Sequence, residues 1–182
     1  MATLIDFGGR ITQGTVVYGV QWGGSSISPL SIVLTNACDF ENDKASYLIV
    51  AALVPAAETI QASKEFASRI GEVQAGQISN AKWKKVKEWL EGYIYNKNVS
   101  RYYLLHPGEV FDSPLLLVDF QCVTSIPINA GVSLDPVAQL PSPYVEQMMV
   151  QFASYIARIP VDREVDSTRA AEELMSPITH AG

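Results

Sequence analysis

The stretch Tyr47-Leu48-Ile49-Val50-Ala51-Ala52-Leu53-Val54 decides the fold of this 182-residue chain. It is almost continuously apolar, and Pro55 follows it directly. A strand with one solvated face alternates apolar and polar residues, whereas a continuous apolar run is typical of a strand covered on both faces. The stretch therefore predicts a central strand of a β-rich domain.

Four further segments with strand character lie on either side of this central strand. They cover residues 14–22, 30–34, 101–105 and 115–126, and each is rich in β-branched, aromatic or aliphatic residues. In the last of them Cys122 falls on the face that is predicted to be apolar and buried. The chain is therefore predicted to be mainly β within an α+β domain.

Helical periodicity replaces strand character between residues 58 and 98. Ser79 is a suitable N-cap for the second of two helices. The apolar residues that follow it share one helical stripe: Trp83, Val86, Leu90 and Ile94. The spacing predicts a helical hairpin inserted into the β domain.

A last helix is predicted to start at Ser142 as its N-cap, with Pro143 in the first helical position and Pro160 as its stop. Residues 1–160 are therefore predicted to form a single domain. Residues 161–182 are polar and acidic, and we expect them to form a flexible tail.

Composition and charge exclude several classes of protein. With 48% hydrophobic and 18% charged residues, the chain has the composition of a folded domain. The net charge of −6 excludes a globally basic surface for nucleic acid. The charge is uneven, however, because residues 61–110 carry eight Lys plus Arg against five Asp plus Glu.

Targeting, membrane, metal and cofactor chemistry leave no signal in the sequence. The N-terminus lacks a basic region followed by an apolar stretch, and the apolar run at 47–57 is shorter than the roughly 20 residues that span a bilayer. Two cysteines and two histidines make a poor zinc site, and no nucleotide-binding motif is present. We predict a cytoplasmic protein with no cofactor, no metal and no membrane partner.

The order of the strands resembles that of the MazF/PemK toxin family. The matching segments are residues 13–17, 28–36 and 47–51, while residues 115–126 and the helix after Ser142 resemble its late strand and terminal helix. The resemblance implies an SH3-like β-barrel, cleavage of single-stranded RNA and a homodimer, with the helical hairpin as an insertion and a C-terminal helix. A generic α+β domain is the alternative.

Two positions depart from the pattern of that family. Its arginine, which stabilises charge on the scissile phosphate, stands immediately before the proline that opens the second long strand, and this chain has Ser28 there. The family also places Thr or Ser after the apolar strand, where this chain reads Leu53-Val54-Pro55. The resemblance therefore implies a non-catalytic or degenerate binding or regulatory module in a bacterial or phage toxin–antitoxin or phage-defence setting.

The segment Thr35-Asn36-Ala37-Cys38-Asp39 follows a predicted buried strand and carries reactive and polar side chains. A nucleophilic Cys38 needs a base, and His106 is the only histidine in the middle of the chain. A thiol-dependent enzyme at Cys38 is one hypothesis, with Asn36 and Asp39 as binding residues. In the competing interpretation Cys38 is a small buried residue, and Asn36 or Asp39 caps a turn.

A basic cluster lies in the predicted second helix. Its members are Lys82, Lys84, Lys85 and Lys87, with Trp89 beside them. Lysines contact phosphates and aromatic rings stack on bases, so this cluster is a candidate surface for single-stranded RNA or for a protein partner. The competing interpretations are a solvated helix face and a face that the acidic tail covers by folding back.

An endoribonuclease with a relocated catalytic set is the alternative function. It would combine a Lys or Arg of the helical insertion with Thr35 or His106 and act on single-stranded RNA.

Overall fold

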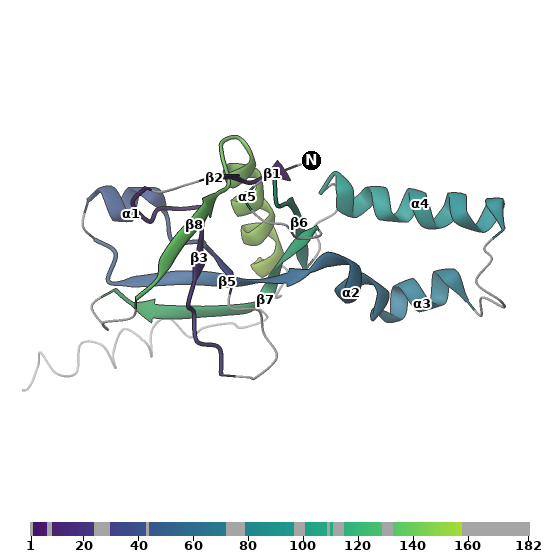
Figure 1. Cartoon of the computed structure of the whole chain (residues 1–182), viewed down its shortest axis with the longest axis horizontal. Helices are drawn as coiled ribbons and strands as arrows, with labels where there is room; N and C mark the ends of the chain where they lie inside the picture. The colour runs from purple at the N-terminus through teal and green to yellow at the C-terminus, as the bar shows by residue number, and fades with distance from the viewer. Residues whose placement is uncertain are drawn as a thin grey trace, which may run out of the picture.

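The structure is a computed structural model that describes residues 2–6, 9–23, 30–42, 44–71, 79–96, 101–108, 110, 115–128 and 133–157. It is a mixed α+β fold dominated by one eight-stranded sheet, which curls into a nearly closed, barrel-like shape (Figure 1). The strands are β1 (Ala2–Thr3), β2 (Ile5–Asp6), β3 (Thr15–Tyr18), β4 (Ser31–Val33), β5 (Tyr47–Pro55), β6 (Tyr102–His106), β7 (Leu116–Pro127) and β8 (Asp135–Gln139). The helices are α1 (Ala37–Glu41), α2 (Ala56–Gln61), α3 (Lys64–Ile70), α4 (Asn80–Ile94) and α5 (Tyr144–Ile156).

The central position predicted for the apolar strand is confirmed. In the order β1-β6-β7-β5-β4-β3-β8-β2, β5 pairs antiparallel with β7 on one side and with β4 on the other. Ala51 and Leu53 belong to one buried cluster, and Leu48 and Val50 belong to another. The continuous apolarity of β5 thus reflects burial on both of its faces.

The first residues of the chain bring the two ends of the sheet together. β1 pairs parallel with β6 at one end of the strand order, β2 pairs antiparallel with β8 at the other, and only Leu4 lies between β1 and β2. Leu4 is 2% exposed, and its N–H donates to the carbonyl of His106 at 2.8 Å. Both edges of the sheet therefore lie on one short segment.

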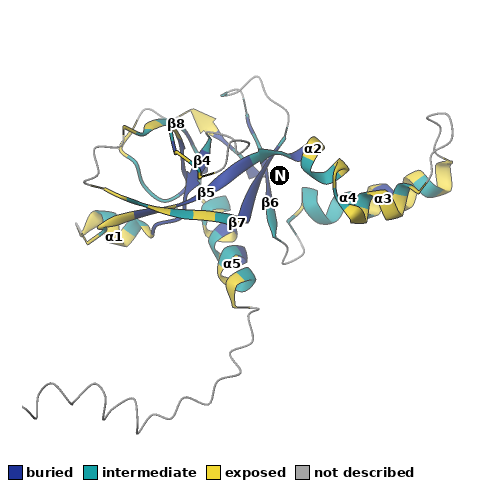
Figure 2. Ribbon diagram, turned by 90° about the horizontal axis from the view of Figure 1, so that it is seen from below, coloured by how far each residue is buried: buried dark blue, intermediate teal, exposed yellow. Residues whose placement is uncertain are grey.

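Helix α5 covers one face of this sheet (Figure 2). Met148 is fully buried in the main core cluster, and the ring of Phe152 lies 5.3 Å from that of Phe120. Tyr103 on β6 donates its hydroxyl to the carbonyl of Tyr144 at 3.3 Å, and burial raises the pKa of Tyr103 to about 12. These contacts fix the C-terminal helix against the middle of the barrel.

The helices differ from the prediction mainly at their ends. Ser79 is the N-cap of α4, as predicted, and its Oγ accepts from the N–H of Lys82 at 3.3 Å. The insertion contains three helices rather than a simple hairpin, because α2 follows β5 directly. The N-cap of α5 is Pro143, without a side-chain cap, so the prediction of Ser142 is wrong by one residue. Pro160 and the segment 161–182 lie outside the described residues.

Strand β7 carries a bulge that changes which side chains reach the core. It pairs with β5 as far as Asp119 and again from Val123, so residues 120–122 have no opposite partner on β5. An odd number of unpaired residues reverses the faces of all later residues on a strand. The prediction that Cys122 lies in the core is therefore wrong, and this thiol is half-buried.

Several elements have no counterpart in the prediction. β1 and β2 have two residues each, and β8 has five residues that include Pro136. Such short segments carry too few residues for a periodic signal. Helix α1 occupies part of the polar connection before β5, where Asn36 provides its N-cap.

Gly108 is predicted to be essential for closing the sheet at Leu4. It adopts a φ of +67°, and a Cβ there would lie 2.4 Å from the carbonyl oxygen of Leu4. We expect Gly108→Ala to lower the free energy of unfolding by about 2 kcal/mol or more, since it adds a clash to an unfavourable conformation. Urea unfolding followed by circular dichroism measures this loss.

Gly23→Ala is the matched control, because a Cβ at Gly23 would meet no atom within 4 Å. We expect its unfolding free energy to stay within about 0.5 kcal/mol of the original protein or to rise slightly. Equal stability of the two variants would contradict the closure at Leu4.

Candidate functional site

Helices α3 and α4 form an arm that extends beyond the barrel (Figure 1). We call this antiparallel pair the helical arm. Few of its residues are buried, since α3 contains no buried residue and α4 contains only Val86. Figure 2 shows that much of its surface is exposed. A helix pair that covers so little of the core is a candidate binding surface.

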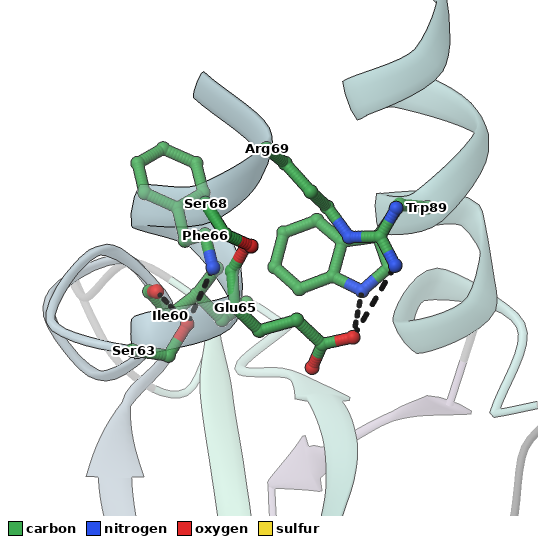
Figure 3. Close-up of polar contacts among 7 residues, drawn as sticks. All are labelled: Ile60, Ser63, Glu65, Phe66, Ser68, Arg69 and Trp89. Carbon is green, nitrogen blue, oxygen red and sulfur yellow. Dashed lines mark hydrogen bonds and ion pairs between the residues drawn. The ribbon is translucent and has the colours of Figure 1, made fainter. Parts of the chain in front are cut away.

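Trp89 is the residue that joins the two helices of the arm (Figure 3). Its indole N–H donates to Oε1 of Glu65 at 3.2 Å, and the same oxygen accepts from Arg69 at 3.3 Å. The Arg69 guanidinium lies 5.1 Å from the centroid of the indole ring, and the Phe66 ring lies 6.1 Å from it. These contacts occupy Trp89 in the packing of α3 on α4, so its ring is not an open stacking platform.

The four predicted lysines do not form one patch. Lys82 lies beside Gly71 at the end of α3, where a Cβ on Gly71 would be 3.0 Å from Nζ of Lys82. The side chains of Lys84, Lys85 and Lys87 are exposed. Lys84 and Lys87 lie three residues apart and are therefore neighbours on the helix surface, whereas Lys85 lies on another flank. Within the described residues, none of these lysines forms an ion pair.

Trp83 lies on the same side of α4 as Lys87 but is not buried. It is 52% exposed, whereas Val86 of the same predicted stripe is 1% exposed. The spacing of Trp83, Lys87, Leu90 and Ile94 places them in one row along the helix. This row runs from the distal half of α4 toward the barrel.

An apolar pocket of about 230 Å³ lies at the barrel end of this row, and we call it the arm pocket. Its lining includes Ala57, Ile60, Leu90, Ile94, Leu104 and Leu115. Apolar side chains from α2, α4 and β6 thus leave a hollow at the barrel end of the row that also carries the exposed Trp83 and Lys87. That combination suits a ligand that is apolar at one end and acidic at the other.

The predicted polar residues at the start of α1 have local structural partners. Oγ1 of Thr35 accepts from the N–H of Ile49 at 2.7 Å, and Thr35 is 6% exposed. Oδ1 of Asn36 accepts from the N–H of Cys38 at 3.2 Å, which confirms the interpretation of Asn36 as a cap. Asp39 is exposed and belongs to the wall of a separate pocket of about 460 Å³ beside α1.

Cys38 and His106 are not brought together. Cys38 is exposed on α1, which follows β4, rather than buried. His106 ends β6, and β7 and β5 separate β6 from β4 in the sheet. Nδ1 of His106 accepts from the N–H of Gly108 at 3.0 Å, and its carbonyl accepts from Leu4. His106 therefore belongs to the closure of the sheet, and the thiol lacks the predicted base.

An ion pair between the buried Asp119 and the partly exposed Arg101 is the polar feature that sequence reasoning missed. Asp119 is 3% exposed and accepts from Nε of Arg101 at 2.6 Å, with a second bond from Nη2. These bonds raise the pKa of Arg101. The same carboxylate accepts from the N–H of Gln121 at 3.0 Å, inside the bulge of β7. The signal for this ion pair in the sequence was Asp119, a single acidic residue within a largely apolar predicted strand.

The ion pair lies beside a third pocket, between the barrel and the helical arm. This pocket measures about 580 Å³, and Tyr93, Arg101 and Tyr102 contribute to its walls. The guanidinium of Arg101 lies 4.9 Å from the centroid of the Tyr102 ring. Because Asp119 neutralises the arginine, the pair acts chiefly as a structural support of the bulge.

Other kinds of site are not found in the described part of the chain. No cluster of three or more His, Cys, Asp or Glu side chains there could hold a metal ion. None of the helices in these residues has the length and apolarity needed to cross a membrane.

Comparisons of the chain with protein-family models, with curated proteins and with solved structures find no match.

Loss of Asp119 is predicted to destabilise the fold strongly. Asp119→Ala leaves Arg101 and the N–H of Gln121 without their acceptor, so we expect a loss of about 2–3 kcal/mol in the free energy of unfolding. The exposed pair Arg69–Glu65 supplies the control, and we expect Glu65→Gln to cost about 0.5 kcal/mol or less. Similar losses in urea unfolding for both variants would show that Asp119 has no special role.

The two cysteines are predicted to differ in reactivity toward a maleimide. Cys38 is exposed, whereas burial and the nearby Asp119 raise the pKa of Cys122. A raised pKa leaves less thiolate at neutral pH, so we expect Cys38 to be labelled first at pH 7 and Cys122 to catch up as the pH increases. Mass spectrometry of peptides from the folded protein measures both rates, and faster labelling of Cys122 would contradict its placement.

Proposed function

We propose that this protein is a non-catalytic binding module that receives an acidic, partly apolar protein segment on its helical arm. The observation that carries the proposal is the row of exposed Trp83, exposed Lys87 and the arm pocket along one side of α4. Apolar hollows bordered by charge are typical of surfaces that bind amphipathic helices. The lysines favour an acidic partner.

The same surface is less suited to single-stranded RNA. Nonspecific RNA sites combine a continuous basic groove with free aromatic rings. Here Trp89 packs against Glu65, Arg69 and Phe66. The arm pocket is lined mainly by aliphatic side chains together with Tyr93, and Trp83 is the exposed aromatic ring of the row. The exposed lysines also do not form the continuous basic groove that such an RNA site needs, because Lys85 lies on another flank of α4 than Lys84 and Lys87. A protein segment therefore fits this surface better.

The positions of the candidate catalytic residues support a non-catalytic role. Thr35 is held by the backbone of β5, Cys38 is exposed on α1, and His106 belongs to the closure of the sheet. The family-like position Leu53-Val54-Pro55 lies within β5, while Ser28 lies outside the described residues. The thiol-enzyme and relocated-ribonuclease hypotheses gain no support from this arrangement.

The MazF/PemK resemblance gives this module a proposed context. A nearly closed barrel-like sheet is compatible with a degenerate SH3-like member of that family. In that proposal the protein is a cytoplasmic homodimer that regulates a toxin–antitoxin or phage-defence system through a protein partner. RNA cleavage by the purified protein that a single barrel substitution abolishes would overturn the non-catalytic role.

Binding of an acidic amphipathic peptide is predicted to depend on Lys84 and Lys87. We expect a fluorescent 21-residue peptide of three EALAELA repeats to bind the full chain, and Lys84→Glu with Lys87→Glu to weaken its binding about tenfold or more. Trp83→Ala should also weaken binding, because it removes the exposed apolar contact. Fluorescence anisotropy at about 50 mM salt, where charges are weakly screened, measures these affinities.

Lys44→Glu is the matched control, because Lys44 is exposed near α1 at the opposite end of the barrel. Lys44→Glu should change the affinity for the peptide by less than about twofold, because salt screens a charge that lies so far from the helical arm. A 20-nucleotide single-stranded RNA tests the competing class of ligand. Tighter binding of the RNA than of the peptide, or an equal effect of all lysine variants, would overturn the proposed function.

A further inference from the structure

We propose that the helical arm is occupied in the free protein by the chain's own acidic C-terminal segment, residues 161–182. This inference rests on the proposed function, since it assigns an internal competitor to the same surface. The segment would place its acidic residues at Lys84 and Lys87 and its apolar residues over the arm pocket. The module would then exchange this segment for its partner.

The arm supplies a surface with two chemically different ends. Toward the distal end of α4, the side that carries the exposed Trp83 and Lys87, with Lys84 as a neighbour of Lys87, is basic. The barrel end of the same side is the apolar arm pocket, beyond Leu90. A matching occupant needs carboxylates next to apolar side chains, in that order along the surface.

Residues 161–182 have that composition. They contain five acidic residues against two arginines, so they complement this basic side of α4. Within them Glu172 and Glu173 are followed directly by Leu174 and Met175, and then by Ile178. The pair of acids matches Lys84 and Lys87, and the apolar residues that follow match the arm pocket.

The connection between α5 and the arm is short enough for this contact. Gln151 of α5 donates to the carbonyl of Tyr102 at 2.9 Å, and Leu104, two residues further along β6, lines the arm pocket. When the length of α5 from Gln151 to Ala157 is added to the distances spanned by these contacts, Ala157 lies within about 25 Å of the arm pocket. The 15 residues from Ala157 to Glu172 extend to about 50 Å, so the linker is long enough.

A carbodiimide cross-linker tests the contact in the full-length protein, because it joins a carboxylate to an amine only when the two are in contact. At low salt we expect cross-links from Glu172 or Glu173 to Lys84 or Lys87 in the monomer band, at least about fivefold more frequent than cross-links to Lys44. These cross-links should disappear at 0.5 M NaCl, where screening is strong. Peptide mass spectrometry identifies the joined residues.

The charge-reversed chain with Glu172→Lys and Glu173→Lys provides a second readout. It should bind the EALAELA peptide about three- to tenfold more tightly than the original chain, because the arm is no longer occupied. Equal cross-linking to Lys44, cross-links only in a dimer band, or unchanged peptide affinity would overturn the inference. If neither chain binds the peptide, the proposed function fails, whereas peptide binding without these effects removes only the internal competitor.

Discussion

The bend at Leu4 is the constraint on which the barrel depends. A sheet of eight strands has two edges with unpaired backbone groups, and here both edges meet on the segment from Ala2 to Asp6. The turn at Gly108 must come close to the carbonyl of Leu4 to allow this meeting. The same closure holds β6 in place, and β6 contributes Leu104 to the arm pocket. A contact at the start of the chain therefore positions the surface at the centre of the proposed function.

The bulge in β7 shows how one buried charge reorganises a strand. Asp119 uses its carboxylate to hold Arg101 and the N–H of Gln121, which would otherwise lack a ladder partner. Burying the Asp119 carboxylate is costly, and its hydrogen bonds offset that cost only if they are complete. After the bulge, the side chains of β7 point to the opposite faces from those that regular alternation would give, and Cys122 therefore lies outside the core.

The helical arm assigns different roles to two tryptophans that lie six residues apart. Trp89 is enclosed by α3 and connects the two helices, whereas Trp83 is exposed next to Lys87. Helical spacing orders the residues of α4 around its axis but does not say which sector a neighbour covers. The position of α3 decides this, and it separates the structural aromatic residue from the one available for binding.

The sequence by itself determined the strands with strong patterns and the helices with clear caps. The apolar run of β5 required burial on both faces, and Ser79 marked the start of α4, because both signals are local. It also gave a cap as one of two interpretations of Asn36, and it grouped four lysines that α4 distributes over more than one flank. Only the tertiary structure decided the closure of the sheet at Leu4, the reversed side-chain faces of β7 after Asp119, and the separation of Cys38 from His106. These features depend on contacts between residues far apart in the chain, which no local periodicity encodes.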